Sequence, residues 1–261
     1  MNHVQLTVIG SSDAFNSGGR GNSCYWIDDD LGTYVVDYGP TAPLKRKLLN
    51  LDLSTLDGLY LTHLHGDHIG GIPGLLIDLC FLQRRTRALW IGGPVGTKER
   101  LEMLYSVSYP GTIPDFMTFP IEYYEWPLRG ETLVGGRMVT SIPAHHDEQA
   151  RPTSIRIESA DSNIVFSGDT GWNEALIPLT ASADLFVCEC SYRQASFPGH
   201  LSLEEIERYR DRLTPKTLML THLNENARAG AEIERERLSL YVADDGMTLI
   251  KDQNGIFIER P

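Results

Sequence analysis

The sequence has little of what marks several large classes of protein. Cysteine is sparse, with 4 residues in 261 and no Cys-x-x-Cys pair, which argues against a disulfide-stapled scaffold and a multi-cysteine zinc module. No apolar run approaches the ~18–20 residues that span a membrane, and the first residues lack the basic-then-apolar pattern of a secretory signal. The sequence therefore predicts a cytoplasmic protein with reduced thiols and no membrane partner.

Positive charge is also scarce. Lys and Arg number 23 against 35 Asp and Glu, which gives a formal net charge of −12. Proteins that grip nucleic acid along its backbone carry a basic face, because Lys and Arg replace the phosphate counterions. The densest basic cluster, Arg84, Arg85 and Arg87, also has the composition of a solvated helix end. A long nucleic-acid footprint is therefore not expected, although the net charge is compatible with a local basic groove.

Strand-like and helix-like patterns alternate along the whole chain, with no linker and no repeat between them. This mixture predicts an α/β protein in which helices cover sheets, organised as a single domain over 1–261. Residues 108–130, rich in proline and aromatic residues, are expected to form a lid or rim over a site. The predicted strands are 4–9, 24–27, 34–36, 56–61, 88–91, 138–142, 153–158, 164–166, 185–188, 216–220 and a hairpin in the tail. The predicted helices are 43–50, 74–85, 97–105, 203–212 and 225–240.

The most informative motif is Thr-His-Leu-His-Gly-Asp-His at 62–68, between a predicted strand and a predicted helix. Residues two apart in an extended chain project to the same side, so His63 and His65 can grip one ion together. The glycine that follows permits a sharp turn, after which Asp67 and His68 can face a second ion. Imidazole and carboxylate donors at this spacing suit zinc or a similar transition ion, so the motif predicts a metal site.

Three later segments share one pattern, an apolar strand that ends at a ligand-type residue. They end at the pair His145 and His146, at Asp169 and at His222. The carboxyl ends of strands converge on one edge of an α/β sheet, where binding sites lie. Each residue alone is more typical of a hydrogen-bonded strand end or a turn, but two ions need more ligands than the first motif supplies. The residue pattern leaves His145 and His146 as alternatives.

These motifs resemble the metallo-β-lactamase superfamily. The segment at 62–68 matches its His-x-His-x-Asp-His signature completely, Ser-Gly-Asp-Thr at 167–170 resembles the segment that carries its bridging Asp, and Thr-His at 221–222 resembles the segment with its last His. The motifs stand in family order from residue 10 to residue 222. The resemblance implies an α/β four-layer αβ/βα sandwich, with two mixed β-sheets packed face to face and helices outside.

Within the superfamily the chain is most similar to the ribonuclease Z-like phosphodiesterase branch. His-Gly-Asp-His-Ile-Gly-Gly-Ile-Pro-Gly-Leu-Leu at 65–76 resembles a run of that branch. Glu189 followed by His-Leu-Ser at 200–202 resembles its Glu and later His-Ser-Thr motif, with Leu201 in place of a Ser. The long Gly/Pro-rich arm that grips tRNA in ribonuclease Z has no counterpart, and Thr-Ser-Ile at 153–155 replaces a usual Gly-Tyr. With the net charge, these departures favour a small phosphodiester, such as a cyclic nucleotide or a short oligonucleotide, over precursor tRNA.

The resemblance also implies a ligand set for two divalent metal ions, with zinc (Zn2+) preferred and manganese (Mn2+) or iron as alternatives. In the order Pro-Ala-x-His at 143–146 it favours His146 over His145. Dimers are common in the branch, so a homodimer is a further expectation. The implied ligands are His63, His65 and His146 for the first metal, Asp67, His68 and His222 for the second, and Asp169 as the bridge.

The resemblance and the residue chemistry together suggest catalytic roles. A hydroxide that bridges the metals would attack phosphorus in line, and Asp67 would orient it. His200 is the candidate general acid for the leaving alkoxide, with Glu189 fixing its tautomer and orientation. The alternatives for these two residues are a surface-loop histidine and a solvated strand end. Asp37 is expected either to orient a ligand histidine or to form a turn.

Three other functions are compatible with parts of this pattern. A lactonase, β-lactamase or arylsulfatase would use the same hydroxide on a carbonyl or sulfur centre, and the His200 segment is the feature that discriminates, because alkoxide departure benefits from a general acid. A di-iron oxidoreductase fits less well, because flavodiiron proteins have Glu in place of His65 and a flavin domain that is missing here. A non-catalytic scaffold disagrees with the full ligand set.

Overall fold

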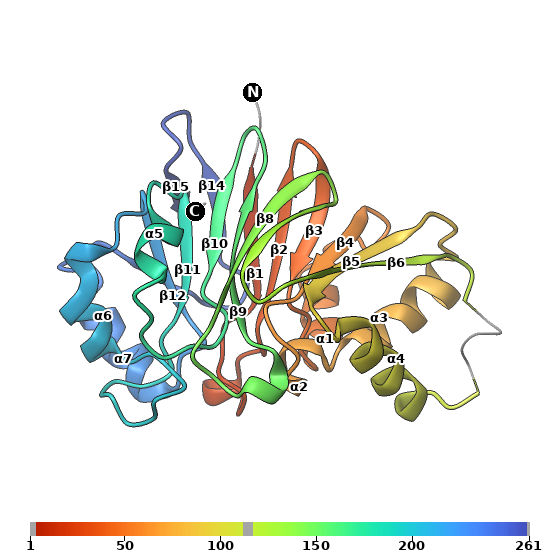
Figure 1. Ribbon diagram of the computed structural model, residues 1–261, viewed down its shortest axis with the longest axis horizontal. Helices are drawn as coiled ribbons and strands as arrows, with labels where there is room; N and C mark the ends of the chain where they lie inside the picture. The colour runs from red at the N-terminus through yellow and green to blue at the C-terminus, as the bar shows by residue number, and fades with distance from the viewer. Residues whose placement is uncertain (1–3, 112–116, 260–261) are drawn as a thin grey trace.

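Two β-sheets pack face to face with helices on both outer sides in the computed structural model, which describes residues 4–111 and 117–259 (Figure 1). The strands of the first sheet are β1 (Gln5–Gly10), β2 (Cys24–Asp29), β3 (Gly32–Val36), β4 (Leu56–Tyr60), β5 (Leu89–Pro94), β6 (Ile121–Trp126), β14 (Thr248–Lys251) and β15 (Phe257–Glu259). The strands of the second are β7 (Gly130–Val134), β8 (Arg137–Pro143), β9 (Thr153–Glu158), β10 (Asn163–Phe166), β11 (Leu185–Glu189), β12 (Thr217–Thr221) and β13 (Tyr241–Val242). The helices are α1 (Ala42–Leu48), α2 (Gly66–Ile69), α3 (Ile72–Ile77), α4 (Thr97–Ser108), α5 (Leu176–Thr180), α6 (Leu203–Tyr209) and α7 (Glu225–Glu234).

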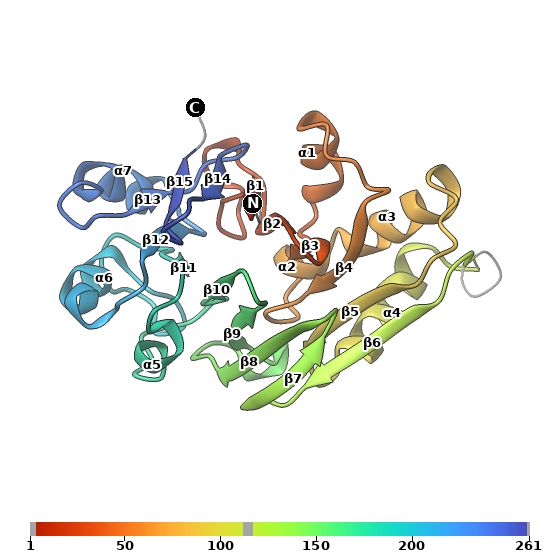
Figure 2. The same ribbon diagram turned by 90° about the horizontal axis from the view of Figure 1, so that it is seen from above.

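Alternation of side chains along the strands builds the layers. In β11, Leu185 and Val187 lie in the core between the sheets, whereas Phe186 and Cys188 lie in an outer core beneath α5, α6 and α7. In β1, Ile9 lies in the other outer core, beneath α1, α3 and α4. The described residues therefore form three apolar cores between four layers, and Figure 2 shows the two groups of helices on opposite flanks. This confirms the predicted four-layer αβ/βα sandwich.

Parallel strands dominate one half of each sheet. The order of the first sheet is β15-β14-β1-β2-β3-β4-β5-β6, and that of the second is β13-β12-β11-β10-β9-β8-β7, over the described ranges. Strands β3 to β6 run parallel, as do β10 to β13. Their carboxyl ends lie at the edge of the sandwich where α2 is found (Figure 1), which we call the site edge.

A buried ion pair joins the two sheets at the opposite edge. Arg137, the first residue of β8, donates from Nε to Asp29 Oδ2 at 2.8 Å, and both side chains are buried. Asp29 ends β2 opposite Gly32, the first residue of β3, which places the pair away from the site edge. Removing one partner of such a pair leaves the other charge buried without a counter-charge, which is strongly destabilising.

Most predicted strands and helices coincide with observed ones; for example, the strand predicted at 153–158 is β9 and the helix predicted from residue 203 is α6. The lid or rim predicted over 108–130 is wrong for Ile121–Trp126, which forms β6 on the outer edge of the first sheet. Residues 112–116 of that prediction lie outside the described residues. The single domain over 1–261 stays a prediction. None of the helices in the described part of the chain combines the length and hydropathy needed to cross a bilayer.

Candidate metal centre

The residues of the first motif lie just beyond the end of β4, at the site edge. His63 and His65 belong to the extended turn after the strand, and Asp67 and His68 belong to the short helix α2. Two histidines of the motif are deeply buried, since His63 is fully buried and His68 is 2% exposed, whereas His65 and Asp67 are half-buried. The strand-then-helix context predicted for this motif is thus the observed one.

The later residues follow strands of the second sheet. His146 comes after β8, Asp169 after β10, and His222 directly after β12. His222 has a positive φ of 55°, a backbone conformation that is uncommon for a residue with a side chain and marks functional turns. Each sheet therefore contributes donors to the same place.

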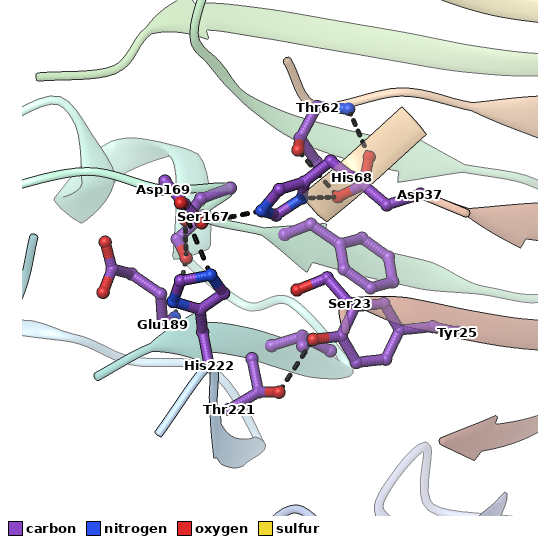
Figure 3. Close-up of a pocket in the computed structure, with 13 residues that line it drawn as sticks. Ser23, Tyr25, Asp37, Thr62, His68, Ser167, Asp169, Glu189, Thr221 and His222 are labelled. Atoms are coloured by element: carbon purple, nitrogen blue, oxygen red, sulfur yellow. Dashed lines mark hydrogen bonds and ion pairs between the residues drawn. The ribbon is translucent and has the colours of Figure 1, made fainter. Parts of the chain in front are cut away.

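The seven expected ligands meet in two adjacent groups at the site edge. Within each group the nitrogen or oxygen donor atoms all lie within 4.8 Å of one another. Figure 3 shows part of the second group, with His68 and His222 both facing Asp169. The first group is His63, His65 and His146, and the second is Asp67, His68, Asp169 and His222.

Asp169 lies between the two groups. One of its carboxylate oxygens is 3.2 Å from His68 Nε2, and the other is 3.5 Å from His222 Nε2. The second oxygen is also 3.7 Å from His63 Nε2 and 3.9 Å from His146 Nε2. A residue that is to bridge two ions needs this position between both donor groups.

The structure separates the two histidines that the sequence left as alternatives. His146 Nε2 lies 3.1 Å from His65 Nδ1, inside the first group. His145 is exposed, and its ring nitrogen lies 2.9 Å from the carbonyl oxygen of Trp172 instead. The structure therefore places His146, and not His145, beside His63 and His65.

The buried polar atoms of the site fit a cation. Among the described residues, Nε2 of His63 and Nε2 of His68 are buried and make no hydrogen bond, and such orphaned atoms are rare in native structures unless a water or an ion satisfies them. Burial opposes ionisation of Asp169 and Asp67, but the imidazoles around them hold the pKa of both carboxyls well below the usual range. Ionised carboxylates beside imidazole nitrogens are the donor set that zinc and related ions prefer.

Each histidine of the two groups has a hydrogen-bond partner on the ring nitrogen that faces away from the site. Such a partner fixes the tautomer and leaves the other nitrogen free to bind a metal. The pairs are His63 Nδ1 with Thr62 Oγ1 at 3.1 Å, His65 Nε2 with Asp147 Oδ2 at 3.3 Å, His68 Nδ1 with Asp37 Oδ2 at 2.7 Å, His146 Nδ1 with the Gly199 carbonyl at 2.8 Å, and His222 Nδ1 with Ser191 Oγ at 2.9 Å.

Asp37 serves two of these histidines. It accepts a hydrogen bond from His68 Nδ1, and it also accepts from the backbone nitrogen of Thr62 at 2.9 Å and from its hydroxyl at 2.8 Å. Because the Thr62 hydroxyl donates to Asp37, its oxygen is left to accept from His63 Nδ1. The structure thus places Asp37 where it can orient ligand histidines, one of the two roles considered for it.

His200 and Glu189 lie together beside the metal-ligand groups. His200 Nδ1 is 2.8 Å from Glu189 Oε1 and 3.9 Å from Asp169, and the ring centres of His200 and His146 are 4.7 Å apart. Burial favours the neutral imidazole, but the hydrogen bond to Glu189 and the negative charges of Glu189 and Asp169 together outweigh it and raise the pKa of His200. Glu189 is buried rather than a solvated strand end.

The sequence analysis did not identify the neutral groups that hydrogen-bond to the clustered histidines on the side away from the site. Thr62, Ser191 and the carbonyl of Gly199 are neutral, and no residue pattern distinguishes them from other threonines, serines and glycines. Thr62 adjoins the first motif and could have been suspected on that ground. Ser191 and Gly199 reach their partners only through the folding of the segment between β11 and α6.

Comparison with known proteins agrees with this geometry. Ribonuclease Z of Methanothermobacter thermautotrophicus is 25% identical over an alignment 303 positions long, which covers 94% of this chain and 96% of that protein. Ribonuclease Z of Haloarcula marismortui is 23% identical over an alignment 304 positions long, which covers 94% of this chain and 96% of that protein.

Solved structures share the fold. The metallo-β-lactamase fold protein YhfI from Bacillus subtilis has a TM-score of 0.78 at 21% identity, covering 96% of this chain and 100% of that one. The short form of human tRNase Z (ELAC1) has a TM-score of 0.73 at 20% identity, covering 94% and 98%.

Fold, donor set and relatives define a metal-dependent phosphodiesterase of the metallo-β-lactamase superfamily, of the ribonuclease Z-like kind, which binds divalent metal. This confirms the predicted superfamily, branch and enzyme class. Within the superfamily, the profile of the family described as "Anti-Pycsar protein Apyc1" matches residues 4–242. The chain belongs to that family.

Proposed function

We propose that this protein hydrolyses a small phosphodiester, such as a cyclic nucleotide or a short oligonucleotide, with two metal ions held by the seven clustered residues. The observation that carries the proposal is the His200–Glu189 pair at 2.8 Å, set directly beside that cluster. The cluster alone would suit any ester, whereas a general acid next to it suits an alkoxide leaving group.

Several features favour a small substrate over precursor tRNA. The net charge of −12 leaves few cations for a long phosphate backbone. The alignment with the Methanothermobacter ribonuclease Z extends over 303 positions, more than the 261 residues of this chain, so that relative carries segments with no counterpart here. Relatives named ribonuclease Z make RNA the second candidate, in the form of a short strand.

The proposed ions are zinc, with manganese or iron as the alternatives. Five imidazoles and two carboxylates with no thiolate make up the donor set, and zinc accepts both donor types readily. His63, His65 and His146 would hold the first ion, and Asp67, His68 and His222 the second. Asp169 would touch both.

When bound, the two ions supply a water that ionises near neutral pH and positive charge against the phosphate oxygens. Asp67 is 15% exposed at its side chain, which lets one oxygen orient the attacking water. The bond between phosphorus and the ester oxygen breaks, and the departing oxygen needs a proton. His200 donates that proton from Nε2, because Glu189 accepts the hydrogen on Nδ1 and holds the ring in place.

A substrate panel combined with metal analysis tests this function. The purified protein should contain about two metal ions per chain and should hydrolyse cyclic nucleotides and a chromogenic phosphodiester. A precursor tRNA, a lactone and an aryl sulfate should be poor substrates. Rapid hydrolysis of the lactone or the sulfate, with no activity on any phosphodiester, would overturn the proposal.

Two finer expectations accompany the function. The protein is proposed to act in the cytoplasm, since buried free thiols are compatible with a reducing compartment. It is also proposed to form a homodimer, which rests on the resemblance to the branch. Light scattering of the purified protein would decide the second point.

A further inference from the structure

The hydroxyl of Ser191 lies at the centre of a buried group of polar side chains. Its Oγ is 2.9 Å from His222 Nδ1, 2.9 Å from Glu189 Oε2 and 3.2 Å from His200 Nδ1. Ser191 is 4% exposed, two residues beyond the end of β11. Among the described residues, it therefore touches a candidate metal ligand, the candidate general acid and the carboxylate between them.

Donor and acceptor chemistry fixes the direction of these hydrogen bonds. His222 Nε2 faces Asp67 at 3.3 Å, on the metal side, so a ring that binds metal there must carry its hydrogen on Nδ1. Ser191 Oγ accepts that hydrogen and gives its own single hydrogen to Glu189 Oε2. His200 Nδ1 then donates to the other oxygen, Glu189 Oε1, at 2.8 Å. We call Glu189, Ser191, His200 and His222 the Glu189 relay.

The same arrangement occurs a second time in the molecule. Asp37 accepts directly from His68 and, through the hydroxyl of Thr62, from His63. In both cases one buried carboxylate holds one imidazole directly and another through a hydroxyl. The two carboxylates come from different sheets, since Asp37 follows β3 and Glu189 ends β11.

We propose that Ser191 is a positioning residue that sets the tautomer of His222 and, through Glu189, ties this metal ligand to the general acid His200. The part that concerns His200 rests on the function proposed above, whereas the part that concerns His222 rests only on metal binding. Without the hydroxyl, the Nδ1 hydrogen of His222 is buried with no acceptor. The ring then loses the tautomer that presents Nε2 to an ion.

The test compares Ser191→Ala with Ser191→Thr and with Ser141→Ala as a matched control. Ser141 is fully buried in β8, and its hydroxyl donates to the Pro127 carbonyl at 2.7 Å, away from the relay. Metal retention is measured by competition with a chelator. The visible spectrum of the cobalt-substituted protein reports the ligand set independently of activity.

Ser191→Ala should weaken retention of one metal ion by about 10–100-fold, the usual effect of removing a group that orients a ligand, and should alter the cobalt spectrum. Its kcat for the phosphodiester should fall while KM changes little. Ser191→Thr should restore both readouts, because it keeps the hydroxyl, and Ser141→Ala should resemble the wild type in both.

The inference would be overturned if Ser191→Ala left metal retention and the cobalt spectrum unchanged. It would also be overturned if Ser141→Ala changed them as much as Ser191→Ala does. If the wild-type protein hydrolyses no phosphodiester, the proposed function fails, but the retention and the spectrum still decide the role of Ser191 toward His222. Unchanged kcat together with weakened retention would remove the link to His200.

Discussion

His200 is the residue that would distinguish this phosphodiesterase site from the sites of hydrolases that use the same metal ligands on other ester classes. We expect His200→Ala to lower kcat for a cyclic nucleotide by about 10²–10⁴-fold, because the leaving alkoxide loses its proton donor. Metal content should stay the same, since His200 is outside both donor groups of the proposed ligands. The decrease in kcat should be far smaller for a nitrophenyl phosphodiester, because its leaving group needs no proton.

His145→Ala is the control for that prediction, because this exposed histidine is bonded to the Trp172 carbonyl and lies outside the cluster. It should keep wild-type turnover on both substrates. Unchanged turnover of the cyclic nucleotide in His200→Ala would remove His200 from the mechanism.

Asp37 is predicted to matter for metal affinity although it touches no metal. Asp37→Asn replaces one of the two carboxylate oxygens by an NH2 group, which cannot accept, so either the Thr62 backbone nitrogen or the pair of donors His68 Nδ1 and Thr62 Oγ1 loses its acceptor. Metal affinity measured by chelator competition should fall about 10–100-fold. Asp52→Asn, an exposed change at a turn carboxylate that accepts from Ser54, should have no effect. Equal affinity in both variants would contradict the role of Asp37.

The sequence predicted acidic and imidazole residues of the site better than the neutral ones that support them. The first motif is local, so its spacing alone indicates a metal site. The choice between His145 and His146 depends on which side of a turn faces inward, and only the fold decides that. Ser191 was not found, because a serine acquires its partners from segments that are 9 and 31 residues away.

At the scale of elements, the segment that carries His200 is held by the start of α6. Ser202 caps this helix: its Oγ accepts from the Glu205 backbone nitrogen at 3.2 Å, and Glu205 Oε2 accepts from the Ser202 backbone nitrogen at 3.0 Å. Ser202→Ala should lower the free energy of unfolding by about 1 kcal/mol, as measured by denaturant titration. Ser106→Ala, an exposed change within α4, should leave it unaltered, and equal losses in the two variants would contradict the importance of the cap.

The wrong prediction at β6 has a physical cause. Strand β6 was taken for part of a rim because residues 108–130 are rich in proline and aromatic residues. It is exposed, since it is the edge strand of its sheet. Alternation identifies a strand clearly only where one face is buried, so edge strands are the elements that sequence patterns detect least well.

At the scale of the whole molecule, metal binding should stabilise the fold. The donor atoms come together only in the native chain, so ions bind the folded state and raise its stability by mass action. Free metal at a thousand times its dissociation constant would contribute about 4 kcal/mol. Thermal unfolding should therefore shift to lower temperature in a chelator and recover when zinc is added back. Identical unfolding temperatures with and without chelator would contradict a site built from these residues.

Each proposed ion takes donors from both sheets, because His63, His65, Asp67 and His68 follow β4, whereas His146, Asp169 and His222 follow strands of the second sheet. At the edge opposite the site edge, the ion pair between Arg137 and Asp29 joins the sheets without needing a metal. Stripping the ions would thus remove the charged links between the sheets at the site edge, where uncharged hydrogen bonds such as Thr153 N to the Thr62 carbonyl at 3.0 Å would remain. Amide exchange and proteolytic cleavage in the metal-free protein should accordingly begin at the turns beyond β4, β8 and β12, while the strand ends around the arginine stay protected.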